Sequence, residues 1–263
     1  MFKKGKLTIL SAILFAGISL VSCKKDDNNS NDDESARVIM RLTDGPANYD
    51  AVYLDVQRVE VTMEGENSVS YLPARQGVYD ILDFRNGLDT LLVDTSMPEG
   101  KINQIRLILG TNNSVVVDGQ TYTLNTPSAQ ESGLKLNLNS TLEAGKTYMF
   151  WIDFDAGKSI NQTGNGKYQL KPVMRAYSEL TDGRIKGIVL PLVSSTTVYA
   201  TKGTETYTAI PTINGYFMFR GLPEGEYKIT YDAADTYRDV IIPNVSVKFG
   251  TEVDLGTTVI DPL

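Results

Sequence analysis

The sequence predicts an all-β protein in which two β-sandwich domains follow a cleaved lipoprotein signal peptide. Three observations lead to this prediction. From Ala36 onward, apolar and polar residues alternate with a period of two, which is typical of strands with one buried face. Gly, Asn, Asp and Pro separate the alternating segments, as they do in tight turns. No segment has the apolar periodicity of a helix longer than about two turns.

The N-terminal segment 1–22 is predicted to be a lipoprotein signal peptide. Three lysines stand among the first six residues, and an apolar stretch of signal-peptide length follows. That stretch is shorter than the roughly 20 apolar residues of a transmembrane helix. It ends Leu-Val-Ser before Cys23, which resembles a lipobox. We therefore expect cleavage before Cys23 and a membrane partner that is held through lipid on this residue.

Residues 23–35 are predicted to form an acidic, disordered tether. After Cys23 the segment contains no apolar residue, so it cannot join a hydrophobic core. Its start, CKKDD, resembles the acidic surface-export signal of Bacteroidetes lipoproteins, which implies an outer-membrane protein exposed at the cell surface. A periplasmic orientation is the alternative. At about 3.3 Å per extended residue the tether reaches at most about 40 Å, so the protein is expected to act close to the membrane.

Charge and composition exclude several classes of function. The formal net charge is −7, and removing the three signal-peptide lysines from 25 basic residues leaves 22 against 32 acidic residues. An acidic chain without a basic block is not expected to bind nucleic acid, because phosphate contacts need clustered Lys and Arg. The absence of histidine excludes Ser-His-Asp and Cys-His catalysis. The single cysteine excludes an intrachain disulfide. No cofactor is expected, while carboxylate chemistry and calcium remain open.

The first folded domain is predicted over residues 36–178 as a β-sandwich. Asp118-Gly119 lies between two apolar runs and indicates a hairpin. Leu134, Leu136 and Leu138 alternate with polar residues, as in a half-buried strand. The expected strands are Val38–Thr43, Ala51–Val61, Val78–Phe84, Ile102–Leu109, Val115–Asp118, Leu134–Leu138, Thr147–Phe154 and Tyr168–Tyr177, with a short helix expected within Leu82–Leu92.

A second, smaller β-sandwich is predicted over residues 183–263. The boundary at Ser178–Gly183 follows a complete strand and precedes a new set of alternating segments. About 80 residues with seven or eight strands match the size of a small sandwich. The expected strands are Arg184–Leu190, Thr197–Thr201, Glu205–Ala209, Gly215–Phe219, Glu226–Ala233, Asp239–Ile242, Ser246–Phe249 and Val253–Val259.

A series of ordered motifs runs through the first domain. The most specific are LTDGP at 42–46, SGLKL at 132–136, LEAGKTY at 142–148, DFDA at 153–156 and GNGKY at 164–168. In these motifs the segment Ala36–Tyr177 resembles domain-of-unknown-function family 4382, which is common in Bacteroidetes lipoproteins. The family has no assigned activity, so the resemblance implies a domain type without implying a substrate.

The second domain has a motif of its own, NGYFMFRGLPEGEY at 214–227. Asn214-Gly215 is expected to form a hairpin, Phe217 and Phe219 to face one side, and Tyr227 to enter the core. In this stretch the domain resembles a carboxypeptidase-regulatory-like module with a transthyretin-type sandwich. Such modules serve as stalks, as spacers or in assembly and are not catalytic, although a fold does not fix a function.

Two acidic residues on one predicted strand are candidate site residues. Asp153 and Asp155 are two apart, so their side chains share a face. Together with Asp44 and Asp50 they are weak calcium candidates through oxygen ligands. The alternative is that the two strand residues accept backbone N–H bonds in the adjacent turn or pair with Lys158.

Trp151 is the third candidate on the same strand. It shares the outer face with Met149, opposite the apolar face. An exposed tryptophan can stack on a sugar ring. The alternative is that another element covers this face. Trp151, Asp153 and Asp155 are therefore the candidate ligand-binding residues, and no catalytic set is predicted.

The sequence as a whole predicts a surface-displayed lipoprotein without enzymatic activity that binds a glycan or a protein ligand. Lipid anchoring, the modular all-β architecture and the missing catalytic sets lead to this prediction. Two alternatives remain open. One is a structural subunit of a fimbria-like assembly, with the tail Val253–Val259 as a donated strand. The other is a carboxylate-dependent hydrolase that uses Asp153 and Asp155.

Overall fold

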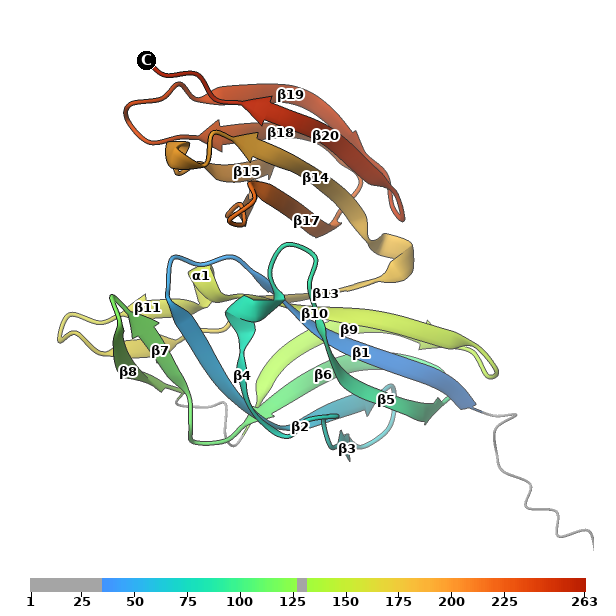
Figure 1. Ribbon diagram of the computed structural model, residues 1–263. Coiled ribbons are helices and arrows are strands. Elements are labelled where there is room, and N and C mark those ends of the chain that lie inside the picture. Colours follow the sequence, from blue (N-terminus) through green and yellow to red (C-terminus); the bar gives the residue numbers. More distant parts are fainter. Residues whose placement is uncertain (1–34, 127–131) are drawn as a thin grey trace, which may run out of the picture. The chain divides into compact units, whose positions relative to one another are not determined.

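The structure is a computed structural model that describes residues 35–126 and 132–263 (Figure 1). The all-β prediction is confirmed, because the described strands form several sheets in sandwich-like domains. The helical segments of the described residues are single turns. Over these same stretches, no helix has the length and hydrophobicity of a membrane span. The signal peptide, Cys23 and the tether lie outside the described residues.

The first sandwich contains strands β1 to β13. Their bounds are β1 Ser35–Gly45, β2 Ala51–Met63, β3 Val69–Tyr71, β4 Gly77–Asp80, β5 Thr90–Pro98, β6 Gly100–Leu109, β7 Ser114–Val117, β8 Gln120–Asn125, β9 Leu134–Leu142, β10 Thr147–Asp155, β11 Ile160–Gln162, β12 Tyr168–Leu170 and β13 Met174–Ser178. One sheet has the order β13-β10-β1-β5. The other has the order β11-β12-β8-β7-β2-β6-β9, and β3 and β4 pair with β2 as well.

Strand β10 is buried on both faces, which distinguishes it from the half-exposed strand that its alternation predicts. Phe150, Ile152 and Phe154 are at most 1% exposed and lie in the core of the first sandwich. Trp151 and Asp153, on the opposite face, are only 6% and 7% exposed. Strand β10 pairs with β1 in parallel and with β13 in antiparallel orientation, so it is central in its sheet. A second layer therefore covers its outer face.

Several local predictions for the first sandwich are confirmed. Asp118 and Gly119 both have positive φ angles and connect β7 to β8, with Val117 opposite Gln120, as in the favoured two-residue hairpin. The alternating leucines lie on β9, where Leu134 and Leu136 are buried. The short helix expected within Leu82–Leu92 is a 3-10 turn, η2, at Ile81–Phe84. Asp80 caps this turn by accepting the backbone N–H of Leu82.

The second sandwich contains strands β14 to β20. Their bounds are β14 Gly183–Leu190, β15 Thr197–Lys202, β16 Glu205–Ala209, β17 Tyr216–Leu222, β18 Gly225–Asp232, β19 Val240–Val247 and β20 Glu252–Val259. The sheets have the orders β17-β14-β20 and β16-β15-β18-β19. Its buried apolar residues, from Ile185 to Ile260, form a cluster separate from the core of the first sandwich.

The motif around Asn214-Gly215 forms a turn between sheets instead of the expected hairpin. Gly215 has a φ angle of 79° and donates its N–H to Thr212 at 2.8 Å. The strands on either side, β16 and β17, belong to different sheets, because β17 pairs with β14. The expected burial in this motif is confirmed, since Phe217, Phe219 and Tyr227 are at most 4% exposed.

Candidate functional site

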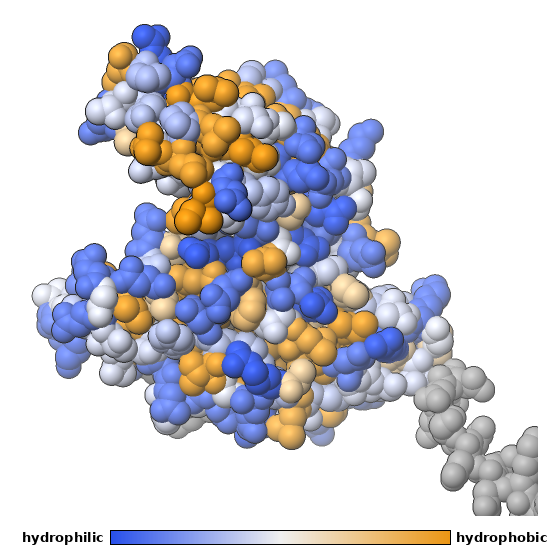
Figure 2. Space-filling model, in the orientation of Figure 1, coloured by the Kyte–Doolittle hydropathy of each residue, from blue (hydrophilic) through white to orange (hydrophobic). Residues whose placement is uncertain are grey.

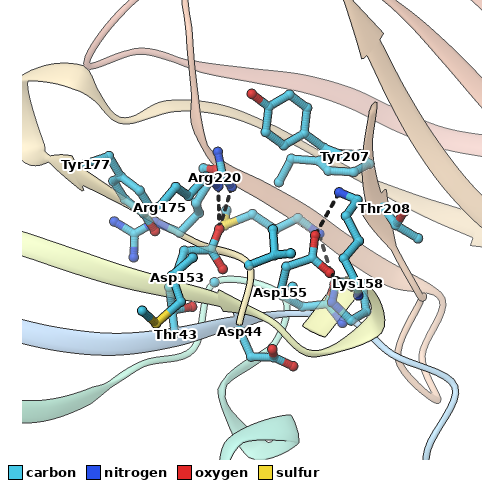
Figure 3. A pocket seen from close by; sticks show the side chains of 18 residues that line it. Thr43, Asp44, Asp153, Asp155, Lys158, Arg175, Tyr177, Tyr207, Thr208 and Arg220 are labelled. Carbon is cyan, nitrogen blue, oxygen red and sulfur yellow. Dashed lines mark hydrogen bonds and ion pairs between the residues drawn. The ribbon is translucent and has the colours of Figure 1, made fainter. Parts of the chain in front are cut away.

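The residues that the sequence singles out on β10 lie where the first sandwich contacts the second. Here β1, β10 and β13 of the first sandwich and β16 and β17 of the second line a cavity of about 130 Å³ (Figure 3). We call this region the junction. It is defined by Asp89, Trp151, Asp153, Arg175, Tyr177, Asp182 and Arg220.

Trp151 is buried in the junction instead of exposed for a ligand. Its ring stacks on that of Tyr177 from the neighbouring β13, with centroids 5.6 Å apart. The guanidinium of Arg220, from β17, lies 4.4 Å from the centroid of the indole. The indole Nε1 donates to Asp89 Oδ2 at 2.7 Å. The second sandwich thus occupies the face that was expected to stack on a sugar, as in the alternative that another element covers it.

Asp153 is held in the junction by Arg175 of β13. Nε of Arg175 donates to Asp153 Oδ2 at 2.6 Å. The remaining guanidinium nitrogens, Nη1 and Nη2, donate to the backbone carbonyls of Gly221 and Arg220 at 2.6 and 2.7 Å. Arg175 also lies over the ring of Tyr207, 4.6 Å from its centroid. Asp153 therefore orients an arginine that binds the second sandwich.

Asp182 and Arg220 form the most buried ion pair of the junction, and sequence reasoning missed both. Asp182 is 2% exposed and belongs to the segment that joins the sandwiches. Arg220 donates to Asp182 Oδ2 from Nη2 at 2.6 Å and from Nε at 3.1 Å. The backbone N–H of Gly221 donates to Asp182 Oδ1 at 2.8 Å. The sequence feature that could have pointed to Asp182 is its position as an acidic residue within the predicted domain boundary, Ser178–Gly183.

Asn86 was also missed, and it covers the open edge of β17. Its backbone has a positive φ of 54°, a conformation that Asn tolerates better than most residues. Its Oδ1 accepts the N–H of Met218 at 3.3 Å, and its Nδ2 donates to the carbonyl of Ile210 at 3.0 Å. Together with Arg175, it satisfies backbone groups that would otherwise form an unpaired sheet edge.

Burial and ion pairing both affect pKa values in the junction. Burial raises the pKa of Tyr177 far above its ordinary value, and the nearby charge of Asp153 adds to this effect. Burial alone would lower the pKa of Arg220, but the hydrogen bond to Asp182 and the neighbouring negative groups more than offset it. Burial alone would lower the pKa of Arg175 as well, but Asp153, Tyr207 and Tyr177 together more than offset it, so this pKa is also raised. Both arginines therefore remain charged at physiological pH.

Asp44 lies on the face of the sheet opposite to Asp153. In the parallel register Asp44 is opposite Phe154, while Thr43 is opposite Asp153, so the side chain of Asp44 is on the core side. It is 6% exposed, and its Oδ1 accepts the N–H of Ala156 at 3.1 Å. Burial raises the pKa of Asp44 well above its ordinary value, and the charge of Asp153 adds to the rise.

The structure brings three of the four calcium candidates, Asp44, Asp153 and Asp155, to the lining of the junction cavity, and Asp50 lies elsewhere. Asp155 caps the single-turn helix α1 (Ala156–Ser159) by accepting the N–H of Lys158, and it also pairs with that lysine's ammonium at 2.7 Å. Asp50 accepts the N–H of Gly119 at a different turn. Within residues 35–126 and 132–263, no group of three acidic or sulfur ligands is placed to hold a metal ion.

The junction as a whole is a network of ion pairs between arginines and aspartates. Arg41 pairs with Asp89, Arg175 with Asp153, and Arg220 with Asp182 and Asp89. Each of these three carboxylates is paired with a guanidinium, although Oδ1 of Asp153 is buried and has no hydrogen-bond partner among the described residues. Because buried ion pairs depend on accurate geometry, this arrangement fixes the orientation of one sandwich on the other.

A larger opening lies in the other sheet of the first sandwich, at β8 and β12. We call it the β8–β12 groove; it has a volume of about 890 Å³ and is lined by β8, β12, the turn Thr163–Lys167 and Thr111. This volume is in the range of small-molecule sites, roughly 300–1,000 Å³. On the face shown in Figure 2, the part of the surface around β8 and β11 carries mostly hydrophilic side chains.

Exposed apolar side chains gather on the second sandwich. Leu190 and Val259 face each other across β14 and β20 and are 40% and 62% exposed. Leu192 and Ile213 line a common groove beside them and are 50% and 87% exposed. Figure 2 shows hydrophobic side chains over this domain. We call this group, together with Val193, the apolar patch.

Comparisons with solved structures give only distant likenesses. A cohesin–X-dockerin complex mutant from Acetivibrio cellulolyticus is 20% identical over 29% of this chain and 56% of that chain, with a TM-score of 0.25. The minor pilin GBS52 of Streptococcus agalactiae is 6% identical over 86% of this chain and 96% of that one, with a TM-score of 0.24. The shaft pilin SpaA of Lactobacillus rhamnosus GG, as its E269A mutant, is 8% identical over 88% and 97%, with a TM-score of 0.23. TM-scores this low do not establish a shared fold.

The family relationship rests on the sequence of the first sandwich. No curated protein sequence matches the chain significantly. Residues 35–172 match a family described as "Domain of unknown function (DUF4382)". The match begins with β1 and ends between β12 and β13, so it covers more than half of the chain and nearly all of the first sandwich. The chain belongs to the DUF4382 family.

Proposed function

We propose that this protein is a lipid-anchored, surface-exposed protein of the outer membrane that has no catalytic activity and binds a glycan or a protein ligand. The β8–β12 groove is the observation that carries the proposal, because it is a ligand-sized opening in the DUF4382 domain. Anchoring at Cys23 and the acidic tether come from the sequence. The second sandwich, fixed by the junction, acts as a rigid support.

The roles of Asp153 and Asp155 argue against the hydrolase alternative. A pair of catalytic carboxylates must flank the substrate with one group able to donate a proton. Asp153 is instead buried against Arg175, and Asp155 caps a helical turn and pairs with Lys158. Alanine variants at both positions are expected to leave any turnover of glycosides unchanged.

The position of the C-terminal tail argues against the assembly alternative. The tail forms β20, which already pairs in parallel with β14 of its own sandwich. Near the middle of β20 the register shifts, Gly256 has a φ of 67°, and the N–H of Gly256 bonds to the side chain of Asp254. Bulges and charges on an edge strand are devices that prevent pairing with another chain.

The apolar patch favours a protein as the second candidate ligand. Its leucine, isoleucine and valine side chains are exposed beside one another, and exposed apolar clusters of this kind mark interaction surfaces. A glutamate at Leu192 would place a charge within the patch without touching the core. If a protein ligand docks there, the Leu192→Glu variant should lose it in a pull-down.

The proposal is tested with the mature chain carrying Cys23→Ser, which removes the lipid acceptor. Glycan arrays probe one ligand class, and pull-downs from envelope fractions followed by binding of the purified candidate probe the other. Binding of a defined glycan or a defined protein is the expected result. The proposal is overturned if neither a glycan nor a protein binds.

A further inference from the structure

The β8–β12 groove exists because two neighbouring strands separate. Strands β8 and β12 run in parallel over only two residue pairs, Leu124 with Tyr168 and Asn125 with Gln169. The described residues show no β8–β12 pairing beyond these two pairs, and both β8 and the turn Thr163–Lys167 line the groove. The turn is held closed by its own hydrogen bonds, among them Thr163 N–H to the carbonyl of Lys167 at 2.7 Å. The opening is therefore part of the built fold.

The described residues of the groove carry little charge. Among residues 35–126 and 132–263, Lys167 is the one charged residue that lines it, and it is exposed. The remaining lining residues carry hydroxyl, amide or aromatic groups or are glycine and leucine. Charged residues make up 22% of the whole chain, so this local composition is distinctive. A neutral wall neither attracts an ion strongly nor compensates for the desolvation of one.

Several amide and hydroxyl side chains in the groove have donors and acceptors that are not used within the protein. Within the part of the chain that the structure describes, the side chains of Asn125, Gln169 and Thr123 have no hydrogen-bond partner. Asn125 and Gln169 stand opposite each other on the two strands. Each amide offers two donors and one acceptor oxygen. The two side chains can thus bind a ligand that carries donors and acceptors together.

A pair of tyrosines gives the groove its apolar surface. The rings of Tyr122 and Tyr168 lie 5.0 Å apart at an angle of 53°. Tyr168 is 6% exposed, whereas Tyr122 is half-buried. The hydroxyl of Tyr122 donates to Gln120 at 2.8 Å, which fixes its ring. Aromatic rings of this kind pack against the C–H faces of ligands while polar groups at their rim remain solvated.

We propose that the β8–β12 groove binds a neutral carbohydrate, an inference that rests on the proposed ligand-binding function and names its ligand class. A sugar offers hydroxyls, which donate and accept, and flat C–H faces in one molecule. The free amides match the first feature, and the partly exposed ring of Tyr122, which lines the groove from the opposite face of β8 to Asn125, matches the second. With Lys167 as the one charge among the described lining residues, an anionic ligand is not favoured. An extended peptide would bind mainly through backbone hydrogen bonds to a sheet edge, whereas the side-chain amides of Asn125 and Gln169 offer the donors and acceptors that suit sugar hydroxyls.

Variants of the mature Cys23→Ser chain test this assignment on a neutral glycan array and then by calorimetry with the best-binding oligosaccharide. The Asn125→Ala/Gln169→Ala double variant should bind at least about tenfold more weakly, because two direct hydrogen-bond partners are lost. The matched control is Gln104→Ala/Asn137→Ala, the same residue types paired on β6 and β9 outside the groove. It should bind within about twofold of the wild type.

Two single variants make the test more specific. Gly164→Trp places a bulky side chain at the groove, where an added Cβ meets nothing within 4 Å and φ is not positive, so it should block binding without unfolding the protein. Lys167→Gln removes the single charge and should leave affinity within about twofold for a neutral ligand. Thermal unfolding of each variant should match the wild type.

The outcomes separate the groove from the wider proposal. Glycan binding that survives both the double variant and Gly164→Trp overturns the groove assignment and leaves the proposed function standing. Binding of acidic glycans alone, or loss of binding in Lys167→Gln, overturns the neutral class. If a defined protein is captured and no glycan binds, the carbohydrate assignment is overturned and the proposed protein ligand stands. Failure to bind either class overturns both proposals.

Discussion

Arg220 of the second sandwich lies over the indole ring of Trp151 of the first, with 4.4 Å between the guanidinium carbon and the ring centroid. The same guanidinium donates to Asp182 in the segment that joins the sandwiches. One side chain therefore connects both domains and their linker. A cation over a desolvated aromatic ring contributes about 2 kcal/mol, and removing one partner of a buried ion pair costs about 3–5 kcal/mol, so the unpaired carboxylate makes the larger difference when Arg220 is removed.

Arg220→Met should destabilise the protein by about 3 kcal/mol, because it leaves the carboxylate of Asp182 buried without its cation. Urea unfolding followed by circular dichroism measures this loss. Arg220→Lys should recover only part of it, since an ammonium cannot reproduce the two hydrogen bonds to Asp182. Arg37→Met, which breaks the exposed pair with Asp94, is the control and should lower the unfolding midpoint far less, because exposed ion pairs contribute little to stability. Equal effects of the two methionine variants would contradict the assigned role of the junction.

Trp151 should report on the junction by fluorescence, because it is the one tryptophan of the chain. In the native protein its indole is covered by Tyr177 and Arg220 and should be poorly accessible to acrylamide. Arg220→Met should increase acrylamide quenching before the protein unfolds globally. The control is Arg37→Met, with quenching equal to that of the wild type. Strong quenching in the native wild type would show that Trp151 is exposed after all.

Gly221→Ala should weaken the junction, because an added Cβ would lie 2.2 Å from the ring of Tyr177 and Gly221 has a φ of 60°. A loss of about 1–3 kcal/mol is expected for such overpacking. Thermal unfolding provides the measurement. Gly164→Ala is the matched control, since nothing lies within 4 Å of its added Cβ. The prediction fails if both alanine variants unfold at the same temperature.

Asp44 should make stability fall as pH rises. Burial raises its pKa in the folded state, so the folded protein holds this proton more tightly than the unfolded chain. The contribution is fully present below the ordinary pKa of an aspartate, about 3.9, and is lost as pH rises through the raised folded value. Asp44→Asn should therefore gain stability relative to the wild type between acidic and neutral pH, as measured by urea unfolding over a pH series.

Asp94→Asn provides a control of opposite sign for this pH series. The hydrogen bond from Arg37 lowers the pKa of Asp94, so its contribution is present at neutral pH and is lost as pH falls through the lowered value. The two asparagine variants should differ from the wild type in opposite directions as pH changes. Parallel trends would mean that a general charge effect dominates.

Calcium removal should leave the fold intact. Asp153 is occupied by Arg175, Asp155 by Lys158, and Asp50 by a backbone N–H. Thermal unfolding should therefore be the same with excess calcium and with a chelator. A clear rise in the unfolding temperature with calcium would identify a site that these carboxylates do not form, and alanine at Asp155 would then test whether it takes part.

Local chemistry could be predicted well because it depends on neighbouring residues. The Asp118-Gly119 hairpin and the alternation of Leu134 and Leu136 are confirmed for this reason. The Asn214-Gly215 turn was expected to be a hairpin, but β17 finds its partner in β14 instead. A turn sequence specifies a reversal of the chain. The choice of sheet for the next strand depends on contacts that are distant in sequence.

The sequence by itself determined the all-β class, the family of the first domain and the alternation that buries Phe150, Ile152 and Phe154. It also placed Trp151 and Asp153 together on the outer face of one strand. Only the tertiary structure decided what covers that face, because Arg175, Asp182 and Arg220 reach it from other elements. Alternation records which side of a strand is apolar. It carries no information about whether solvent, a ligand or another domain lies against the other side, since that depends on long-range packing.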